Sequence, residues 1–344
     1  MVNMAIFLMS FYSGQQVCRQ RCRINHRHIS AFSTLSASNR TSIYISTIYI
    51  STQWDFYWTG KTMSIEVKPA TPTTGAEIVG IDLGSGLSDS DFDIIQSALD
   101  AHGVIYLRDQ KITPEQQVDF TRRFGVPDIN FNALRFGVDG SPEIYIISNI
   151  TEDGKPIGTR RAGETWHTDM SYAKEPAAST MLYAVEVPTL HGLPLGDTAF
   201  ANAAAAWDTL PADLKDEILC LRGIFDFRGR KRSSPVSAKD IANYPPVEHP
   251  IVRSHPRTGR KSLYIVRNDC TEILGRSARD SEALIEALAD HIVKPEFIYQ
   301  HKWRVGDVVI WDNCTVQHRA ILDYDLPQRR LMWRTTVKGT APYC

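Results

Sequence analysis

The chain has 344 residues, of which 43% are hydrophobic and 22% charged. These proportions are typical of a globular protein with a sizeable core, as one large domain or two smaller ones. The 38 basic and 39 acidic residues nearly cancel, which argues against general nucleic-acid binding. No apolar run approaches the roughly 20 residues that span a bilayer, so no membrane partner is expected. The six cysteines are scattered, which indicates reduced thiols rather than a disulfide framework.

Residues 1–62 differ in composition from the rest of the chain. They are rich in Arg, Ser and Thr and contain one acidic residue, Asp55, a composition typical of organelle transit peptides. The alternative, which we favour, is a mis-assigned extension upstream of a true start at Met63. We therefore expect a disordered extension over 1–62 and one folded domain over 63–344. The protein is expected to be cytoplasmic if translation starts at Met63, and organellar if the extension is real.

Beyond Met63, strand and helix signals follow one another along the chain. Helices are expected over 88–103 and 113–125, where Ser, Asp or Thr precedes apolar residues at helical spacing and a Gly follows. Further helices are expected within 200–221, in two segments broken at Pro211, and over 279–293. Residues 223–248 read as a polar, irregular surface excursion. A strand followed by a turn is expected over 76–86, and strands are expected over 104–109, 143–149, 178–187, 262–266, 307–312 and 331–337.

This order of elements predicts the fold class. Many short strands spread along the chain, with helices grouped between them, favour an α+β protein whose core is a β-sandwich or barrel packed by helices. No Gly-rich dinucleotide fingerprint follows a strand, so a Rossmann fold is not expected.

The stretch GETWHTDMSY, residues 163–172, contains a candidate metal site. In an extended strand residues i and i+2 point to the same face, so His167 and Asp169 would direct an imidazole and a carboxylate to one ion. His318, just beyond the apolar strand VVIWD, supplies a third ligand. Two histidines and one carboxylate, with open positions, are the arrangement of non-haem Fe(II) oxygenases. The alternative is a histidine and an aspartate at a strand end that bind no metal.

Two arginines downstream are candidates for binding an anion. In an extended strand Arg330 and Arg334 share one face with Met332 between them. Guanidinium groups on an apolar strand are costly unless an anion meets them, and Arg binds carboxylates through two parallel hydrogen bonds. The alternative is that both arginines pair with Asp or Glu side chains of the same chain.

From about Met63 to its end, the chain resembles the Fe(II)/2-oxoglutarate-dependent dioxygenases of the taurine dioxygenase and 2,4-dichlorophenoxyacetate dioxygenase family. The resemblance covers about 280 residues and rests on ordered motifs. Among these motifs are GVIYLRDQKITPEQQVDFTRRFG, WHTDMSYAKEPAASTMLYAVEVP, GDTAFANAAAAWDTLP and VGDVVIWDNCTVQHRA followed by RRLMWRTT.

The resemblance implies a double-stranded β-helix (jelly roll) with packing helices, and a small-molecule substrate. It implies that Fe(II) is bound by His167, Asp169 and His318. It also implies that the enzyme consumes 2-oxoglutarate as a co-substrate together with O2. The distal carboxylate of 2-oxoglutarate would be anchored by Arg330 and Thr198. Family members are often homodimers or tetramers, so a homo-oligomer is expected. The implied reaction hydroxylates a C–H bond and releases succinate and CO2.

Residues in contact with substrate are harder to identify from the sequence. Arg334 matches a position near the keto-acid and the anionic group of the substrate. Trp166, Tyr172 and Arg161 are further candidates, with core packing or surface charge as the alternative reading. His191 lies in a loop that would approach the site, whereas the remaining histidines of the domain read as surface or core residues: His102, His249, His255, His291 and His301.

The chain also departs from the family pattern. The link TLHGLPL before Thr198 is longer than usual, which would shift Thr198 from its position in the family. Gly163 stands where taurine dioxygenase has Asn, and the loop FGVPDINFNALRFG lacks the histidine that helps to hold the sulfonate of taurine. Taurine itself is therefore not favoured as the substrate. We expect a small organic acid, such as a sulfonate, an aryloxyalkanoate or another carboxylate. The alternatives are the same chemistry on an amino acid or natural-product intermediate, and a cupin-like metal-binding sensor without redox turnover.

Overall fold

The computed structural model describes residues 64–129, 133–230 and 238–344. Every element described below belongs to one compact unit, Lys61–Cys344. The extension expected over 1–62 lies outside the described residues. No helix in the described part is long and apolar enough to cross a membrane.

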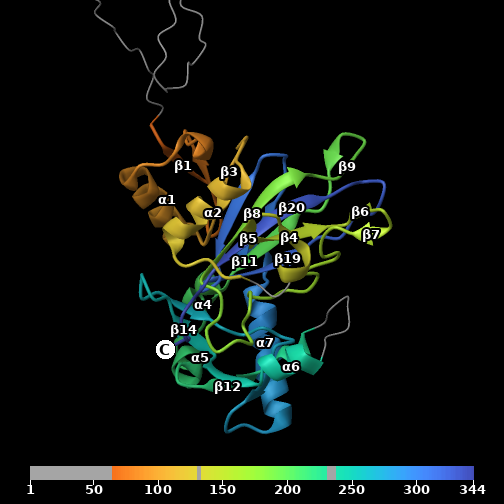
Figure 1. The fold of residues 1–344 in the computed structure, drawn as a ribbon. Helices are drawn as coiled ribbons and strands as arrows, with labels where there is room; N and C mark the ends of the chain where they lie inside the picture. Colours follow the sequence, from red (N-terminus) through yellow and green to blue (C-terminus); the bar gives the residue numbers. More distant parts are fainter. Residues whose placement is uncertain (1–63, 130–132, 231–237) are drawn as a thin grey trace, which may run out of the picture. The chain divides into compact units, whose positions relative to one another are not determined.

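The largest sheet has eight strands in the order β1-β2-β3-β18-β8-β20-β5-β4 (Figure 1). Strands β2 and β3 pair in parallel, and the other neighbours pair antiparallel. The strands span Glu66–Pro69 (β1), Ala76–Val79 (β2), Val104–Leu107 (β3), Gly137–Val138 (β4), Ser141–Ser148 (β5), Ser179–Glu186 (β8), Val308–Asp312 (β18) and Leu331–Val337 (β20).

Two helices pack on one face of this sheet, as the sequence predicts. Helix α1 (Asp89–His102) is capped by the Ser88 side chain and ends at Gly103 in the left-handed conformation. Helix α2 (Pro114–Phe124) begins with a capping box formed by Thr113 and Gln116. The core between the helices and the sheet contains Ile95 and Leu99 of α1, Phe120 of α2, and Ile105, Leu107, Val308 and Ile310 of the sheet.

A three-stranded sheet packs on the opposite face of the large sheet. Its order is β17-β11-β19, with β11 spanning Thr198–Asn202, β17 Ile298–His301 and β19 Val316–Ala320. One buried cluster joins the two sheets through Val104, Tyr145, Leu182, Val309, Trp311 and Met332 on one side and Phe200, Tyr299 and Val316 on the other. Since side chains alternate between the faces of a strand, burial on both faces explains why VIYL and VVIW are continuously apolar.

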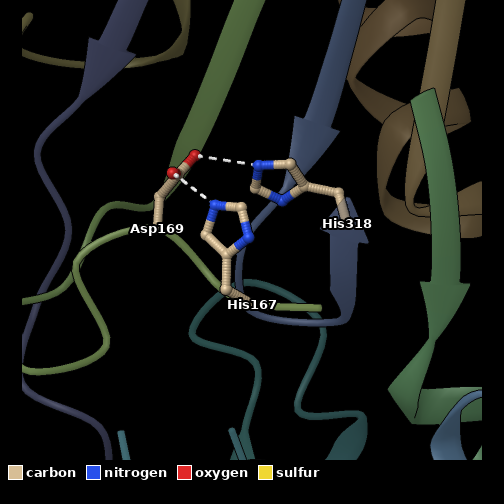
Figure 2. A group of neighbouring side chains, drawn as sticks. All are labelled: His167, Asp169 and His318. Carbon is tan, nitrogen blue, oxygen red and sulfur yellow. Dashed lines mark ion pairs between the residues drawn. The ribbon is translucent and has the colours of Figure 1, made fainter. Parts of the chain in front are cut away.

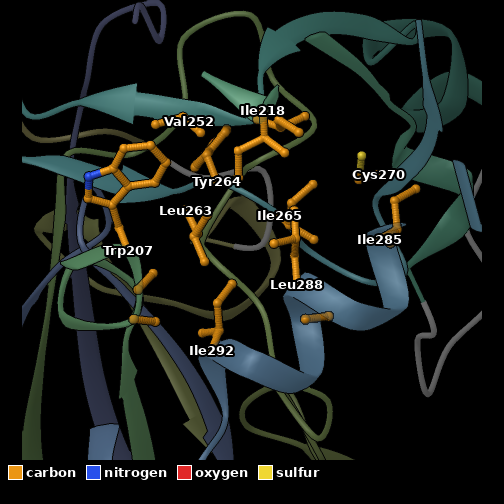
Figure 3. Packing of buried hydrophobic residues seen from close by; sticks show 14 of the residues in the cluster. Trp207, Ile218, Val252, Leu263, Tyr264, Ile265, Cys270, Ile285, Leu288 and Ile292 are labelled. Carbon is orange, nitrogen blue, oxygen red and sulfur yellow. The ribbon is translucent and has the colours of Figure 1, made fainter. Parts of the chain in front are cut away.

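A second region surrounds helix α7 (Ala278–Ile292). Its apolar core includes Trp207, Ile218, Leu263, Ile285 and Leu288 (Figure 3). The other elements that contribute to this core are α4 (Ala203–Asp208), α5 (Ala212–Ile218), β12 (Arg222–Phe225), β13 (Val247–Pro250), β14 (Val252–Ser254), β15 (Lys261–Leu263) and β16 (Cys270–Ile273).

Several short elements complete the described chain. They are η1 (Leu83–Ser85), α3 (Ala133–Phe136), β6 (Thr151–Glu152), β7 (Lys155–Pro156), β9 (Thr189–Leu190), β10 (Leu193–Pro194), η2 (Phe227–Gly229), α6 (Ala238–Asn243) and η3 (Pro295–Phe297).

Two expectations from the sequence are wrong. Residues 200–202 were expected to be helical, but they belong to β11, and α4 begins only after Asn202, whose side chain caps Ala204 and Ala205. The second concerns residues 223–248, which are not simply a polar surface excursion. They include most of β12, and Phe225 and Phe227 are buried. A four-residue strand such as RGIF is too short to give a periodic signal.

Candidate active site

His167 and His318 face one another across a two-residue bridge between chain segments far apart in sequence. The His167 N–H donates to the His318 carbonyl at 3.0 Å, and the His318 N–H donates to the His167 carbonyl at 2.9 Å. His318 lies in β19, but Asp169 lies in a turn after the bridge rather than in a regular strand. The structure therefore brings His167 and Asp169 together as the sequence predicts, but in a turn rather than in the expected strand.

The three side chains converge on one space (Figure 2). His167 Nε2 lies 3.7 Å from Asp169 Oδ1, and His318 Nε2 lies 3.8 Å from Asp169 Oδ2. One ligand atom from each residue lies within 4.8 Å of the others, and all three residues are buried. These separations exceed a hydrogen bond. They fit donors arranged around a single transition-metal ion, with metal–ligand bonds of about 2.0–2.2 Å.

His167 and His318 are both in the neutral form that can bind a metal ion. His167 Nδ1 lies 2.8 Å from the Thr165 carbonyl, to which it donates, so Nε2 keeps its lone pair. Burial lowers the pKa of His167 to about 4, with a further contribution from Arg230. Burial likewise lowers the pKa of His318 well below its usual range. Both rings are therefore neutral at pH 7, as metal ligands must be.

Asp169 is held by several side chains. Arg334 Nη2 lies 2.8 Å from its Oδ1, and the Thr180 hydroxyl donates to its Oδ2 at 2.8 Å. Asn313 accepts the Asp169 backbone N–H at 3.2 Å and donates to Thr180 at 3.0 Å. Burial opposes ionisation of Asp169, but Arg334, both histidines and Thr180 outweigh it and hold the pKa of the carboxyl well below its usual range. The carboxylate is thus ionised and fixed in orientation.

A second buried group, formed by His255, Asp312 and Cys314, has the residue types of a metal site. His255 Nδ1 accepts the backbone N–H groups of Arg257 and Thr258, at 3.2 and 3.1 Å. Its proton therefore lies on Nε2, which is 3.3 Å from Asp312 Oδ2. A metal would need the lone pair that this tautomer lacks, so the group is structural. His255 is a core residue, as the sequence predicts.

His167 and His318 line a pocket that also contains the two arginines predicted to bind an anion. Its lining consists of Ile147, Ala162, Gly163, His167, Leu182, Thr198, Trp311, His318, Ala320, Arg330 and Arg334. Arg330 and Arg334 therefore line the same pocket, as the sequence predicts, although Arg330 lies just before β20 rather than within it. Arg334 pairs with Asp169, so for this residue the internal ion pair left open by the sequence is present.

Arg330 differs from Arg334 in having no ion pair with an acid of the described residues. The Arg330 N–H donates to Asn149 Oδ1 at 2.8 Å, and its carbonyl accepts the Ser148 hydroxyl at 2.7 Å, which fixes the backbone. The side chain is buried, and its Nε has no hydrogen-bond partner among the described residues. Burial lowers the pKa of Arg330, yet the group stays charged at pH 7. A buried guanidinium without an acidic partner favours an anionic ligand.

The unusual link before Thr198 forms a hairpin rather than displacing the threonine. Strands β9 and β10 pair around His191 and Gly192, both with positive φ, which suits a two-residue turn. Thr198 then begins β11 and lines the pocket. His191 is exposed at the hairpin tip and is not among the pocket residues.

The three further residues that were candidates for contact with substrate lie outside the pocket lining. Trp166 packs against the α7 region and beneath Arg319, at 5.2 Å from the guanidinium carbon to the ring centroid. Tyr172 is buried against Phe227. Arg161 is exposed and pairs with Glu164 at 3.1 Å.

Sequence analysis missed the residues that orient the site. Thr180, Asn313 and Trp303 contact Asp169 or Thr198 through hydrogen bonds. Asn313 follows the strand VVIWD directly, and its position beside the His318 motif was the available signal.

Gly163 is needed for the position of His167. Its φ is +77°, and an added Cβ would lie 3.0 Å from His167 Cε1. We expect Gly163→Ala to weaken metal binding about 10–100-fold, the usual cost of displacing a ligand's support. Gly192→Ala is the matched control, because φ is +78° there and nothing lies within 4 Å of the added Cβ. Metal titration of both variants tests this, and equal affinities would contradict it.

Two histidines and one carboxylate beside an arginine-lined pocket are the arrangement of non-haem metal oxygenases. Comparison with known proteins agrees. The family described as "Taurine catabolism dioxygenase TauD, TfdA family" matches residues 66–336. An alpha-ketoglutarate-dependent 2,4-dichlorophenoxyacetate dioxygenase of Cupriavidus pinatubonensis is 33% identical over 295 residues, which cover 81% of this chain and 99% of that protein.

Solved structures give the same result. A putative alpha-ketoglutarate-dependent taurine dioxygenase from Burkholderia xenovorans is 35% identical with a TM-score of 0.69, covering 81% of this chain and 94% of that one. AAD-2 in complex with Mn(II) and N-oxalylglycine is 30% identical with a TM-score of 0.68, covering 82% and 100%. The chain belongs to the TauD/TfdA family. It is a dioxygenase that depends on 2-oxoglutarate (alpha-ketoglutarate), as the sequence predicts.

Proposed function

We propose that the enzyme uses Fe(II), held by His167, Asp169 and His318, to hydroxylate a C–H bond of a small anionic organic acid. The observation that carries the proposal is the convergence of these three side chains beside the buried guanidinium of Arg330, which has no acidic partner among the described residues. With the metal, 2-oxoglutarate and O2 bound, oxidative decarboxylation to succinate and CO2 supplies the oxidant. The protein supplies orientation and excludes water.

The roles of the other pocket residues follow from their contacts. Arg330 would bind the distal carboxylate of 2-oxoglutarate through its guanidinium, and Thr198 would donate a hydroxyl proton to the same group. Arg334 neutralises Asp169 and lines the pocket. Thr180 and Asn313 hold the Asp169 carboxylate in one orientation.

The charge balance supports an anionic substrate. Counting Asp169, a divalent ion, dianionic 2-oxoglutarate, Arg330 and Arg334 together leaves one positive charge in a buried pocket. Ile147, Leu182 and small residues complete the lining, which suits an apolar body attached to the anion. We therefore place aryloxyalkanoates first, ahead of sulfonates and other carboxylates. Hydroxylation of an amino acid or natural-product intermediate remains the second candidate, because the same charge would attract an amino-acid carboxylate.

The experiment is an anaerobic titration of protein beginning at Met63 with Fe(II) and then 2-oxoglutarate. We expect a weak visible charge-transfer band from the chelated keto-acid, which is absent in Arg330→Ala at the same ligand concentration. Members of an organic-acid panel that includes 2,4-dichlorophenoxyacetate, taurine and amino acids are then added. The true substrate class shifts the band and gives substrate-dependent succinate in air. A protein that binds iron but gives no band would contradict the proposal and favour the non-redox sensor.

Other parts of the proposal concern architecture. The two facing sheets with a shared core support a double-stranded β-helix, and the family match over 66–336 supports a catalytic domain within 63–344. We also propose a homo-oligomer, a dimer or tetramer, which analytical ultracentrifugation would measure, and cytoplasmic location for protein made from Met63.

A further inference from the structure

Trp303 contacts both residues proposed to anchor 2-oxoglutarate. It follows β17, whose last residue, His301, pairs with Thr198 of β11. The Trp303 indole Nε1 donates to Thr198 Oγ1 at 3.1 Å. The Arg330 guanidinium carbon lies 6.0 Å from the centroid of the Trp303 ring. One buried side chain thus links the hydroxyl and the guanidinium that line the pocket.

The Trp303 contact determines which way the Thr198 hydroxyl donates. An indole N–H only donates, whereas a hydroxyl has one proton and two acceptor lone pairs. Trp303 therefore occupies a lone pair of Thr198 Oγ1 and leaves the hydroxyl proton for another acceptor. No other hydrogen bond to Thr198 Oγ1 is made within the described residues. Since Thr198 lines the pocket, that proton is available to a ligand.

The indole is itself held in place. The His301 ring packs against Trp303 edge to face, with centroids 4.7 Å apart. His301 Nε2 lies 3.0 Å from Asp307 Oδ2, and Nδ1 lies 2.8 Å from the Tyr299 hydroxyl. Asp307 accepts from Nε2, so Nδ1 accepts from Tyr299, and the orientation of the His301 ring is fixed from both sides. Trp303 therefore has little freedom to turn its N–H away from Thr198.

We propose that Trp303 is a positioning residue for the co-substrate. Its indole N–H holds the Thr198 hydroxyl as a donor toward the distal carboxylate of 2-oxoglutarate, and so raises the affinity for a keto-acid that has this second carboxylate. The inference rests on the proposed anchoring role of Thr198 and Arg330. Donation to a carboxylate gives a charge-assisted hydrogen bond, which is stronger than one between neutral groups. If Trp303 merely filled space, replacing it would change the affinity for keto-acids with and without a distal carboxylate to the same extent.

The test is calorimetric titration of the Mn(II)-loaded protein with two keto-acids. Trp303→Phe keeps an aromatic ring and removes the N–H. We expect this variant to bind 2-oxoglutarate roughly five- to tenfold more weakly, the value of one hydrogen bond, with unchanged Mn(II) affinity. For 2-oxopentanoate, which lacks the distal carboxylate, the variant and the wild type should have the same Kd.

Two further variants isolate the contact. Thr198→Val removes the hydroxyl, and adding Trp303→Phe to it should cause no further loss of 2-oxoglutarate affinity. Trp333→Phe is the matched control, because this tryptophan packs in the helix-facing core, and it should leave both affinities unchanged. In the wild-type protein loaded with diamagnetic Zn(II), the NMR signal of the Trp303 indole N–H should shift more with 2-oxoglutarate than with 2-oxopentanoate. This measurement does not depend on the variant folding.

The outcomes separate the two proposals. A wild-type protein that binds Mn(II) but neither keto-acid would contradict the proposed function itself. If the wild type binds 2-oxoglutarate and Trp303→Phe binds it equally well, the positioning role is wrong. It is also wrong if Trp303→Phe weakens both keto-acids by the same factor, or if the indole signal responds equally to both, because either result indicates packing alone.

Discussion

Replacing Asp169 by Ala is expected to abolish turnover. Asp169 is the only carboxylate that the described chain places between His167 and His318, and two neutral imidazoles alone bind a divalent ion weakly. The change also leaves the Arg334 guanidinium without its 2.8 Å partner, close to where the ion would sit. We therefore expect a loss of metal affinity larger than the roughly 10–100-fold cost of removing an outer supporting residue. Metal content after dialysis and substrate-dependent succinate formation measure it.

Controls must separate chemistry from folding in this variant. Asp169→Asn keeps the shape of the side chain and should also lose turnover, because an amide is a poorer ligand for iron than a carboxylate. Asp290→Asn, which removes an exposed partner of Arg267 on α7, should leave metal binding and turnover unchanged. Substrate-coupled succinate retained in Asp169→Ala would overturn the ligand assignment. The thermal midpoint of each variant shows whether it is folded.

The features that could be predicted are those determined by residues close together in the sequence. The caps at Ser88 and Thr113 define α1 and α2, and residue types at short spacing identify His167, Asp169 and the two arginines. The two-residue period of a strand predicted that Arg330 and Arg334 face one space; both line the pocket, although Arg330 lies just before β20. Each of these patterns is contained in one short segment of the sequence, so it can be recognised without knowing the fold.

What could not be predicted depends on contacts between distant segments. Trp303 meets Thr198 across 105 residues, and Asn313 meets Thr180 across 133. The sequence also could not predict whether Arg334 pairs with an acidic side chain or with a ligand. Its partner, Asp169, lies far upstream, and the direction of the Asp169 side chain depends on the bridge between His167 and His318. The sequence also misassigned residues 200–202 because the alanines that follow favour a helix, while the pairing of β11 with β17 and β19 stabilises a strand.

Arg330→Ala is expected to reduce the affinity for 2-oxoglutarate with little effect on metal binding. The buried guanidinium has no acidic partner among the described residues and faces the pocket. A charged hydrogen bond contributes about 1.5–3 kcal/mol, so losing one of them should raise the Kd for 2-oxoglutarate about 10- to 150-fold. Because the keto-acid would still chelate the metal at its other end, saturating 2-oxoglutarate should restore part of the turnover.

Arg329→Ala provides the matched control in the adjacent position. Arg329 is exposed and pairs with Glu186 at 2.9 Å, outside the pocket lining, so its removal deletes the same charge from the same segment without touching the co-substrate. Surface pairs of this kind contribute roughly 0–1 kcal/mol, and its 2-oxoglutarate Kd should stay within about twofold of the wild type. Arg330→Lys should recover only part of the loss, because an ammonium cannot form the paired contacts of a guanidinium. If Arg329→Ala and Arg330→Ala weaken 2-oxoglutarate binding equally, long-range charge rather than direct contact explains the effect, and Arg330 is not the anchor.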